Sequence, residues 1–489
     1  MSYGVPSSTD MAALMGQLQK ANPYSYQAPT LVGAQTPLVP SGGSQVANNI
    51  SPLIPQQLAQ TLSIATSSMS DLKLWPMISK IAAQNTVVEY NRVLKHGAEH
   101  SPFIAEGGTA ALNRSTYEKV AVQIKYMAER REVTDQASIV NIVGPSADGI
   151  AEATRRGTEN LLRRLEKELF HGDSTLNPLA WNGIIKQIKD GGNVADLRGK
   201  AVSALYLSEV LGALYSAPFY GMISHILVTP RVLQELIKQT VHHGRHDQIQ
   251  LSGSNVTFGA QSISITGPYG PVPVVACPFL EREDRIAPAL ATSAVFDGQV
   301  TTPTISVAAA AGQNAASKFV AADAGDYIYR VVPVGKAGVG EAVDTAAVSV
   351  VAGDQVTFTI AQTNTTEVDF YRIYRSKPDA ADANGALLVG EIARTVAATQ
   401  FIDNNDNVAG CSEIVFVNQS PDYMCYYQML SLVRRPLAQL STSYPFLLMM
   451  FGAPAVKLPN KMFVVKNAGV NASSGLEGIS DPILLGLNP

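Results

Sequence analysis

The chain has 489 residues, of which 46% are hydrophobic and only 16% are charged, below the charged share of about 25% typical of soluble domains. This length is enough for about two to four domains, and a surface with few charges suits a subunit that neighbours largely cover. The net charge of −4 gives no basic footprint for nucleic-acid recognition. The cysteines are odd in number and none have CxxC spacing, which argues against a disulfide framework or a zinc site: Cys277, Cys411 and Cys425.

Residues 1–83 are predicted to form an N-terminal arm. Residues 1–50 are rich in Ser, Gly, Pro, Gln and Asn and cannot bury a core by themselves, so disorder and ordering against neighbouring subunits both stay open. The N-terminus has no basic stretch leading into an apolar run, so no signal peptide is expected. The apolar stretch at 446–456 is too short to span a bilayer. We therefore expect a soluble protein made in the cytoplasm, without a membrane partner.

Residues 84–134 are predicted to form a long two-stranded ribbon. Residues 85–96 read as one strand, and residues 117–135 alternate again, with Val120, Val122 and Ile124 on one face. The loop between them, 96–115, carries three glycines. Because an isolated two-stranded ribbon is only marginally stable in water, we expect a neighbouring subunit to support it.

A long helix is predicted at 147–170, within a region that spans 135–175. Its apolar residues recur every three to four positions and form one stripe: Ile150, Ala153, Gly157, Leu161, Leu165 and Leu169. At roughly 1.5 Å per residue the helix is a rod of about 35 Å. Arginines, glutamates and a lysine occupy its other faces.

Residues 176–296 mix helices and strands. The pattern predicts a helix at 204–218, a buried strand followed by a helix at 223–239, and a strand at 257–266. Residues 267–280 are predicted to be a loop that leads into another strand. This segment favours a compact layer of helices on a sheet.

Residues 297–411 differ in composition and are rich in Val, Thr, Ala and Gly. Short alternating runs recur about every ten residues, which is typical of a β-sandwich. The run YIYRVVPVGKAGVGEA at 327–342 resembles the strand, glycine turn and strand of fibronectin type III and immunoglobulin-like domains. Residues 412–489 restore the earlier mixed character, so the sandwich reads as an insertion in an α+β fold.

Motifs for catalysis or cofactor binding are absent from the sequence, which has no GxGxxG after a strand and no GxxxxGK[ST], HExxH or GxSxG. The run HHGRH, with His242, His243 and His246, lacks the carboxylates of a hydrolase metal site. The run LEREDR at 280–285 is predicted to be a solvated face and not an acid–base pair. We expect no enzyme activity, no metal and no cofactor.

The order of these parts resembles that of the Hong Kong 97-like major capsid proteins of tailed phages. The resemblance implies an extended loop at 84–134, a peripheral domain with a spine helix at 135–175, and an axial domain in 176–296. It also implies an immunoglobulin-like insertion at 297–411, and a return to both domains with a C-terminal tail at 412–489. The closing run YPFLLMMFGAPAVKLPNKMFVV supports the same assignment.

What the resemblance implies about function is self-assembly into an icosahedral head shell in the virion. The partners would be other copies in hexamers and pentamers, a portal, scaffolding or decoration proteins, and non-specifically enclosed double-stranded DNA. Two alternatives stay open: a tail, baseplate or adhesive protein that uses the sandwich to bind a host, and a compartment shell of the encapsulin type. Candidate subunit contacts are charged residues of the ribbon and helix: Lys95, His96, Glu106, Arg114, Lys119, Lys125, Arg155, Arg156, Arg163 and Arg164. Isopeptide cross-links through the ribbon lysines have no positive sign in the sequence.

Overall fold

The computed structural model divides the chain into two units, residues 1–59 and 60–489, and all the residues that it describes belong to the second. The predicted N-terminal arm up to residue 68, the histidine run beyond His242, and the C-terminal tail from residue 470 lie outside them. The described ranges are 69–98, 103–110, 112–139, 149–242, 250–252, 255–257, 263–290, 295–296, 303–335, 338–362, 367–395, 398–439 and 442–469.

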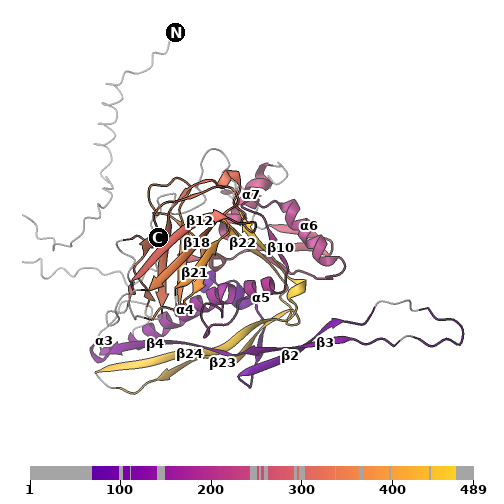
Figure 1. Ribbon diagram of the computed structural model, residues 1–489. Helices are drawn as coiled ribbons and strands as arrows, with labels where there is room; N and C mark the ends of the chain where they lie inside the picture. The colour runs from indigo at the N-terminus through magenta and orange to yellow at the C-terminus, as the bar shows by residue number, and fades with distance from the viewer. Residues whose placement is uncertain are drawn as a thin grey trace, which may run out of the picture. The chain divides into compact units, whose positions relative to one another are not determined.

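A four-stranded sheet carries the long helix (Figure 1). Its strands are, in order, β1 (Lys80–Ala82), β23 (Met424–Pro436), β24 (Ser443–Val456) and β4 (Lys125–Thr134). Strand β1 is parallel to β23, and the other neighbours are antiparallel. The helix α4 (Gly149–His171) packs on β4 and β24, so the C-terminal part of the chain completes a sheet that begins near residue 80.

The helix α4 agrees with the predicted helix to within two residues at each end. Leu161, Leu165 and Leu169 of the predicted stripe are buried. Gly157 is buried as well. A Cβ atom at this position would lie 2.5 Å from Leu448 Cδ1. The glycine therefore lets the helix approach β24 closely, which a larger residue would prevent.

A six-stranded mixed sheet forms the second layer, with helices α6 and α7 against it. Ser203 caps α6, because its side chain accepts a hydrogen bond from the backbone N–H of Tyr206 at 3.1 Å. The strands β25 and β22, from the end of the chain, lie between β5 and β6. The elements are, in sheet order, β5 (Val194–Asp196), β25 (Phe463–Ala468), β22 (Ser412–Val417), β6 (His225–Val228), β10 (Gly270–Ala276) and β9 (Ser264–Gly267), with α6 (Ala204–Tyr215) and α7 (Pro230–His242).

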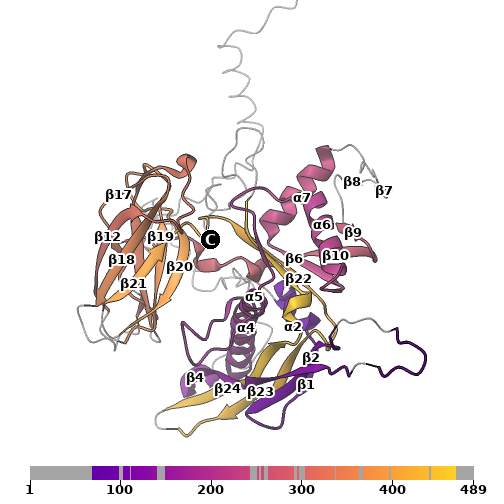
Figure 2. The same ribbon diagram turned by 45° about the vertical axis from the view of Figure 1, so that its right-hand side comes forward.

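The described residues between 295 and 403 form antiparallel sheets, and from Ile305 onward they surround an apolar core of their own (Figure 2). One sheet has the order β12-β18-β21, and its inner side chains meet those of β14 and β19 from the other. Tyr329 donates a hydrogen bond to the buried Asp403 at 3.1 Å, and Arg375 pairs with the same carboxylate at 2.8 Å. The strands are β11 (Val295–Phe296), β12 (Ile305–Gln313), β13 (Gly325–Tyr327), β14 (Tyr329–Gly335), β15 (Gly338–Val339), β16 (Val343–Asp344), β17 (Val348–Val350), β18 (Asp354–Gln362), β19 (Phe370–Arg375), β20 (Leu387–Ala393) and β21 (Thr399–Asp403).

Short elements connect these layers. They are α2 (Leu74–Met77), α3 (Asp135–Ile139), α5 (Ile184–Asp190), β7 (Gln250–Ser252), β8 (Asn255–Thr257) and the 3-10 helices η2 (Met69–Asp71), η3 (Pro278–Leu280), η4 (Glu283–Arg285), η5 (Ala321–Asp323) and η6 (Pro459–Lys461). No helix within the described ranges is both long and apolar enough to cross a membrane.

The predicted ribbon is shorter in the structure. Strand β2 (Val87–Lys95) pairs with β3 (Thr116–Gln123), and the pairing ends with the hydrogen bond from the Ile124 N–H to the Thr86 carbonyl at 2.8 Å. The predicted second strand, 117–135, is therefore two strands, because β4 leaves the ribbon to pair with β24. Both halves alternate in sequence because both are half-buried, so the alternation could not reveal the change of partner.

Candidate assembly surface

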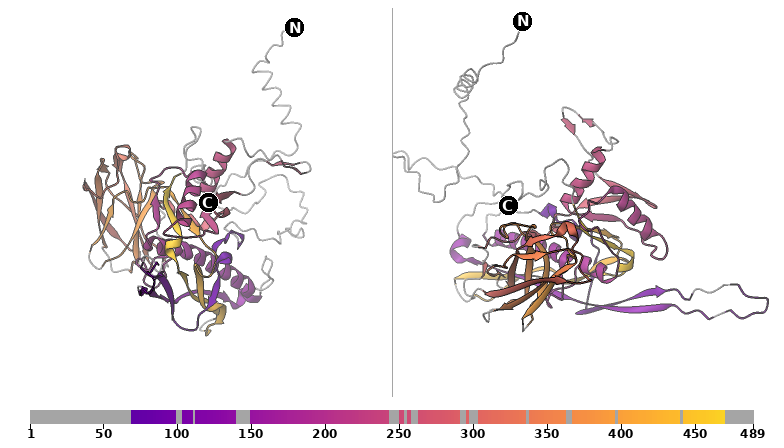
Figure 3. Two further views of the ribbon diagram at one scale, coloured as in Figure 1. Left: turned by 90° about the vertical axis from the view of Figure 1, so that its right-hand side faces the viewer. Right: turned by 45° about the horizontal axis from the view of Figure 1, so that its top comes forward.

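The β2–β3 ribbon projects away from the other elements, as the indigo strands in the right panel of Figure 3 show. In the sheet each strand pairs only with the other, and no residue of either strand is fully buried. At the base of the ribbon, Val88, Tyr90 and Val122 pack against a small core, and Tyr90 donates a hydrogen bond to the Val456 carbonyl at 3.3 Å. Val93, Leu94 and Tyr117 are among its exposed large side chains. Exposed apolar surface of this kind marks an interaction site.

Charged pairs within the ribbon hold its register. Arg92 pairs with Glu118 at 2.6 Å, and Lys119 pairs with Glu89 on the opposite strand. Such cross-strand pairs contribute roughly 0.2–1 kcal/mol each. Lys119, a predicted subunit contact, thus has its charge matched inside its own subunit.

The neck of the ribbon tip is closed by side chains. The backbone N–H of Ala98 donates to Asn113 Oδ1 at 2.8 Å, and Asn113 Nδ2 donates back to the Ala98 carbonyl at 3.2 Å. Ser115 donates to the His96 carbonyl at 2.9 Å. Gly97 has φ +153°, and a Cβ atom there would lie 1.9 Å from Asn113 Oδ1, so this position requires glycine. The neck therefore fixes where the tip begins.

The tip beyond this neck presents large apolar side chains to solvent. Ile104 is 57% exposed, Leu112 is 79% exposed and Phe103 is 88% exposed. Glu106 lies beside Gly107 in a turn in which the N–H of Gly108 bonds the Ala105 carbonyl at 2.8 Å.

The other predicted contacts of the ribbon lie in three places. Lys95 and His96 lie where β2 ends, and Arg114 lies just before β3; all three are exposed. Lys125 starts β4, and its ammonium group donates to the Pro178 carbonyl at 2.8 Å.

The predicted helix arginines differ in how far their charges are matched. Arg155 and Arg156 bond Glu152 at 2.9 and 2.8 Å, and hydrogen bonding from Arg155 is the main cause that lowers the pKa of Glu152. Arg163 lies 3.4 Å from Glu283. Arg164 is exposed, and no ion pair joins it to any other residue of the described ranges. Of the four, Arg164 is thus the best placed to bind an outside group.

Glu166 is a structural residue that was not predicted. It is fully buried in α4, and its carboxylate accepts hydrogen bonds from the backbone N–H groups of Lys73 (2.9 Å), Leu74 (2.6 Å) and Trp75 (2.7 Å). Burial raises the pKa of this carboxyl group, and the three donors oppose the rise. The sequence held a signal, because Glu166 follows Leu162 by four residues and precedes Leu169 by three, on the buried face.

The run LEREDR is not the solvated face that the sequence predicted. Arg282 bonds both carboxylate oxygens of Glu391, at 2.8 and 2.6 Å, and also bonds Asp284 at 2.7 Å. Arg372 bonds Glu391 at 3.0 Å and Asp284 at 2.9 Å. Although burial opposes ionisation, Arg282 holds the pKa of Asp284 and of Glu391 below the usual range. This ion cluster joins η4 to β19 and β20; Glu283, in contrast, points to Lys167 of α4 at 2.5 Å.

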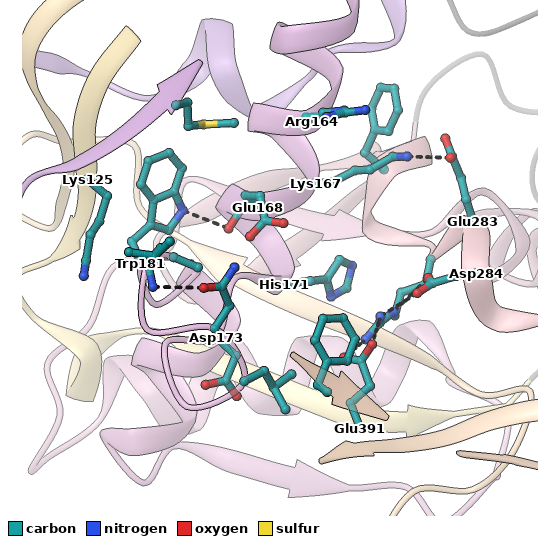
Figure 4. Close-up of a pocket in the computed structure, with 18 of the residues that line it drawn as sticks. Lys125, Arg164, Lys167, Glu168, His171, Asp173, Trp181, Glu283, Asp284 and Glu391 are labelled. Carbon is teal, nitrogen blue, oxygen red and sulfur yellow. Dashed lines mark hydrogen bonds and ion pairs between the residues drawn. The ribbon is translucent and has the colours of Figure 1, made fainter. Parts of the chain in front are cut away.

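A cavity of about 800 Å³ lies beside this ion cluster (Figure 4). Its walls come from α4, the loop before α5, the start of β4, the segment 279–284, and the strands β15, β19 and β20. Arg164, Lys167 and Lys125 line it together with Trp181. Metal binding is not indicated here, because no cluster of three His, Cys, Asp or Glu side chains suited to an ion exists in the part of the chain that is described.

Comparison with known proteins bears on what these surfaces do. No protein-family model matches the chain. It is 23% identical over 430 residues to the major capsid protein of Staphylococcus phage S25-3, covering 84% of this chain and 89% of that protein. The major capsid protein of Staphylococcus phage K gives the same identity and coverage. This similarity confirms the predicted function of a major capsid protein of tailed phages. It favours that function over the tail or baseplate alternative.

Solved structures of shell proteins also align with the chain. The capsid of the native GTA particle aligns over 87% of this chain and 98% of its own, at 8% identity and a TM-score of 0.45. The holo-SrpI encapsulin complex from Synechococcus elongatus aligns over 88% and 98%, at 10% identity and a TM-score of 0.43.

Proposed function

We propose that the chain builds the icosahedral head shell of a tailed double-stranded DNA phage through the Hong Kong 97-like arrangement of its parts. The observation that carries the proposal is the outer part of the β2–β3 ribbon, where Val93, Leu94 and Tyr117 are exposed. Only the base of the ribbon, with Val88, Tyr90 and Val122, packs on the core of its own subunit. A two-stranded ribbon is marginal in water, so the surface of a neighbouring subunit is its expected support.

In this proposal each region has an assembly role. The ribbon is the extended loop, α4 is the spine helix of the peripheral domain, and the six-stranded sheet with α6 and α7 is the axial domain that meets its copies at the capsomer centre. Residues 297–411 are an immunoglobulin-like insertion at the outer surface. Support comes from their separate core and from the way the chain returns at β22 to the sheet that it left after β10.

The partners in this proposal follow from charge as well as from shape. Other copies are the main partner, in hexamers and pentamers whose heterologous contacts close by rotation. A net charge of −4 favours non-specific enclosure of DNA over tight binding. A portal and scaffolding or decoration proteins complete the shell, which is assembled in the host cytoplasm, and the role of the subunit is structural and not enzymatic.

Deleting residues 98–114 tests the role of the ribbon. We expect a folded, soluble subunit that does not form closed shells in electron micrographs, because the deletion removes the tip and leaves the cores intact. Ile402→Ser, on an exposed position of β21, is the matched control and should leave shells unchanged. Normal shells from the deletion variant would contradict the proposal.

A further inference from the structure

We propose that the free edge of strand β12 (Ile305–Gln313) pairs with the same strand of a second copy of this chain, antiparallel and about a two-fold axis. This inference rests on the proposed function, because the pairing is expected where copies are already held together in a shell. It adds a contact that the proposed function does not contain, since the antiparallel sheets between residues 295 and 403 would then join two subunits.

Strand β12 has backbone groups that its own subunit leaves unpaired. It ends the sheet β12-β18-β21 (Figure 2), and its nine residues pair with β18 without a bulge. Because alternate residues of an antiparallel strand turn their N–H and C=O groups to opposite sides, roughly half of them face away from β18. Strand β17 contacts β12 but pairs with β13, and no backbone hydrogen bond joins β12 to any other described element. Such an edge is a template for a further strand.

The other long edge strands carry features that block this kind of pairing. Strand β4 has five charged residues, and β20 contacts η4 while its Glu391 bonds Arg282. Strand β21 has five residues and turns the charge of Asp403 inward. Charges and short length are the usual protection of sheet edges. Strand β12 reads ISVAAAAGQ, and among the described edge strands of more than five residues it is the one without a charged residue.

The lack of charge indicates that the partner is a second copy. A two-fold axis brings each group of a surface near its own copy, so a charged strand would meet like charges, which destabilise a strand pair. The positions of β18 beside the outward face of β12 are uncharged as well: Gln355, Thr357, Thr359 and Ala361. A surface without charge can therefore face itself without repulsion.

The pairing should be weak between free subunits and favoured in a shell. The exposed side chains of β12 are mostly alanines, so the contact buries little apolar surface to offset the freedom that two free subunits lose. In a shell the copies are already held close, and the second contact becomes effectively intramolecular. Contacts within a ring are heterologous, so we place the β12 pair on the two-fold axes between rings.

Single-cysteine cross-linking in assembled shells tests the pairing. With the pair centred near Ala309, Ala310 lies diagonally across from its own copy at roughly 7–8 Å, within reach of a short bis-maleimide. The chain would carry Ala310→Cys with Cys411→Ser, because the other two native cysteines are buried. We expect covalent dimers and no larger oligomers on denaturing gels, because a two-fold contact gives each subunit one partner.

Ile402→Cys in the same background is the matched control. Ala310, Thr357 and Ile402 form one row across the sheet, and Ile402 is exposed at its other edge. In a β12 pair, Ile402 lies five strand spacings of about 4.8 Å from its copy, roughly 24 Å, so we expect at most about a tenth as much dimer.

A lysine at the edge supplies a second readout. Ala308→Lys, added to the Ala310→Cys chain, brings two like charges together across the axis and should lower the dimer fraction about fivefold. Thr359→Lys is its control, because Thr359 is the neighbour of Ala308 on β18 and lies one strand in from the edge. It should leave the dimer fraction unchanged.

The outcomes separate this inference from the proposed function. Normal shells without dimers from Ala310→Cys, with equal dimers from Ile402→Cys, or with dimers that Ala308→Lys does not reduce would overturn the pairing and leave the capsid function standing. Amides of β12 that are protected from exchange in virions but not in shells of this chain alone would show that another protein covers the edge, and the inference would be wrong. If the parent chain with only Cys411→Ser builds no shells, the proposed function fails, and the pairing fails with it.

Discussion

Glu166 is expected to anchor residues 73–75 to the long helix, and replacing it tests how that end of the chain is held. Its carboxylate is the acceptor for three successive backbone N–H groups that start α2. A four-residue helix such as α2 has no stability of its own. Leu74 is also buried in the core beside α4, so Glu166 and this apolar packing together hold the segment in place.

The magnitude follows from the number of acceptors lost. A buried donor left without a partner costs roughly 1–3 kcal/mol. Glu166→Gln keeps one oxygen and loses one acceptor, so we expect a loss of about 1–3 kcal/mol in the free energy of unfolding. Glu166→Ala removes the acceptor for all three donors and leaves a void in the core, so we expect about 3–5 kcal/mol.

Chemical denaturation of the unassembled subunit measures the loss, and hydrogen exchange of the amides of residues 73–75 locates it. Glu159→Ala on the same helix is the control. Its side chain makes only partly exposed pairs with Arg155 and Arg156, so a loss of about 0.5 kcal/mol is expected. The reasoning would be refuted if Glu166→Ala cost less than about 1 kcal/mol and left the exchange of these amides unchanged.

Three further predictions concern other parts of the subunit. The folded pKa of Asp284 lies below its ordinary value of about 3.9, so its contribution to stability is present above that pH and is lost as the pH falls below it. Calorimetry from about pH 2 to about pH 5 should therefore show a smaller acid-induced drop for Asp284→Asn than for the parent. Gly157→Ala should destabilise by about 1–2 kcal/mol, since its Cβ would meet Leu448 at 2.5 Å, whereas Gly212→Ala, with open space, should stabilise by up to about 1 kcal/mol; equal effects in thermal melts would contradict the packing argument. In the free subunit the amides of β2 and β3 should exchange faster than those of α4, and assembly should protect them; rapid exchange that persists in shells would exclude a covering neighbour.

Local patterns predicted the elements well where one period holds over a long stretch. The helix predicted at 147–170 is observed at Gly149–His171. The prediction succeeded because the leucines that recur at helical spacing are also buried on one face of the helix. The alternation across 117–135 was equally regular but spans two strands that pair with different partners. Strand β4 pairs with β24 more than 300 positions away, and pairing at that separation leaves no trace in a local pattern.

The candidate site was less predictable, because segments far apart in the sequence build it. The run LEREDR looks solvated when read alone, yet Arg282 finds Glu391 more than a hundred residues later. Arg155 and Arg156 looked like contacts for a partner, but i,i+3 and i,i+4 glutamates already match them. That spacing was legible in the sequence. The same spacing would have paired Arg164 with Glu168, and only the structure shows that no ion pair joins Arg164 to another described residue.

The helix α4 is held by many more buried contacts than the β2–β3 ribbon, and this difference fits the assembly roles that we propose for them. The helix α4 has a buried stripe and a buried carboxylate, and an ion pair through Glu283 joins it to η4. The ribbon has two matched ion pairs and a closed neck, but no fully buried residue. A segment with so little internal stability is stabilised more by a partner's surface than a rigid segment is, because binding buries apolar side chains that stay exposed in the free subunit. If a neighbouring subunit covers the ribbon, as we propose, each contact orders the most weakly held segment of one subunit against the surface of another. Assembly would then be strongly cooperative, although each contact alone is small.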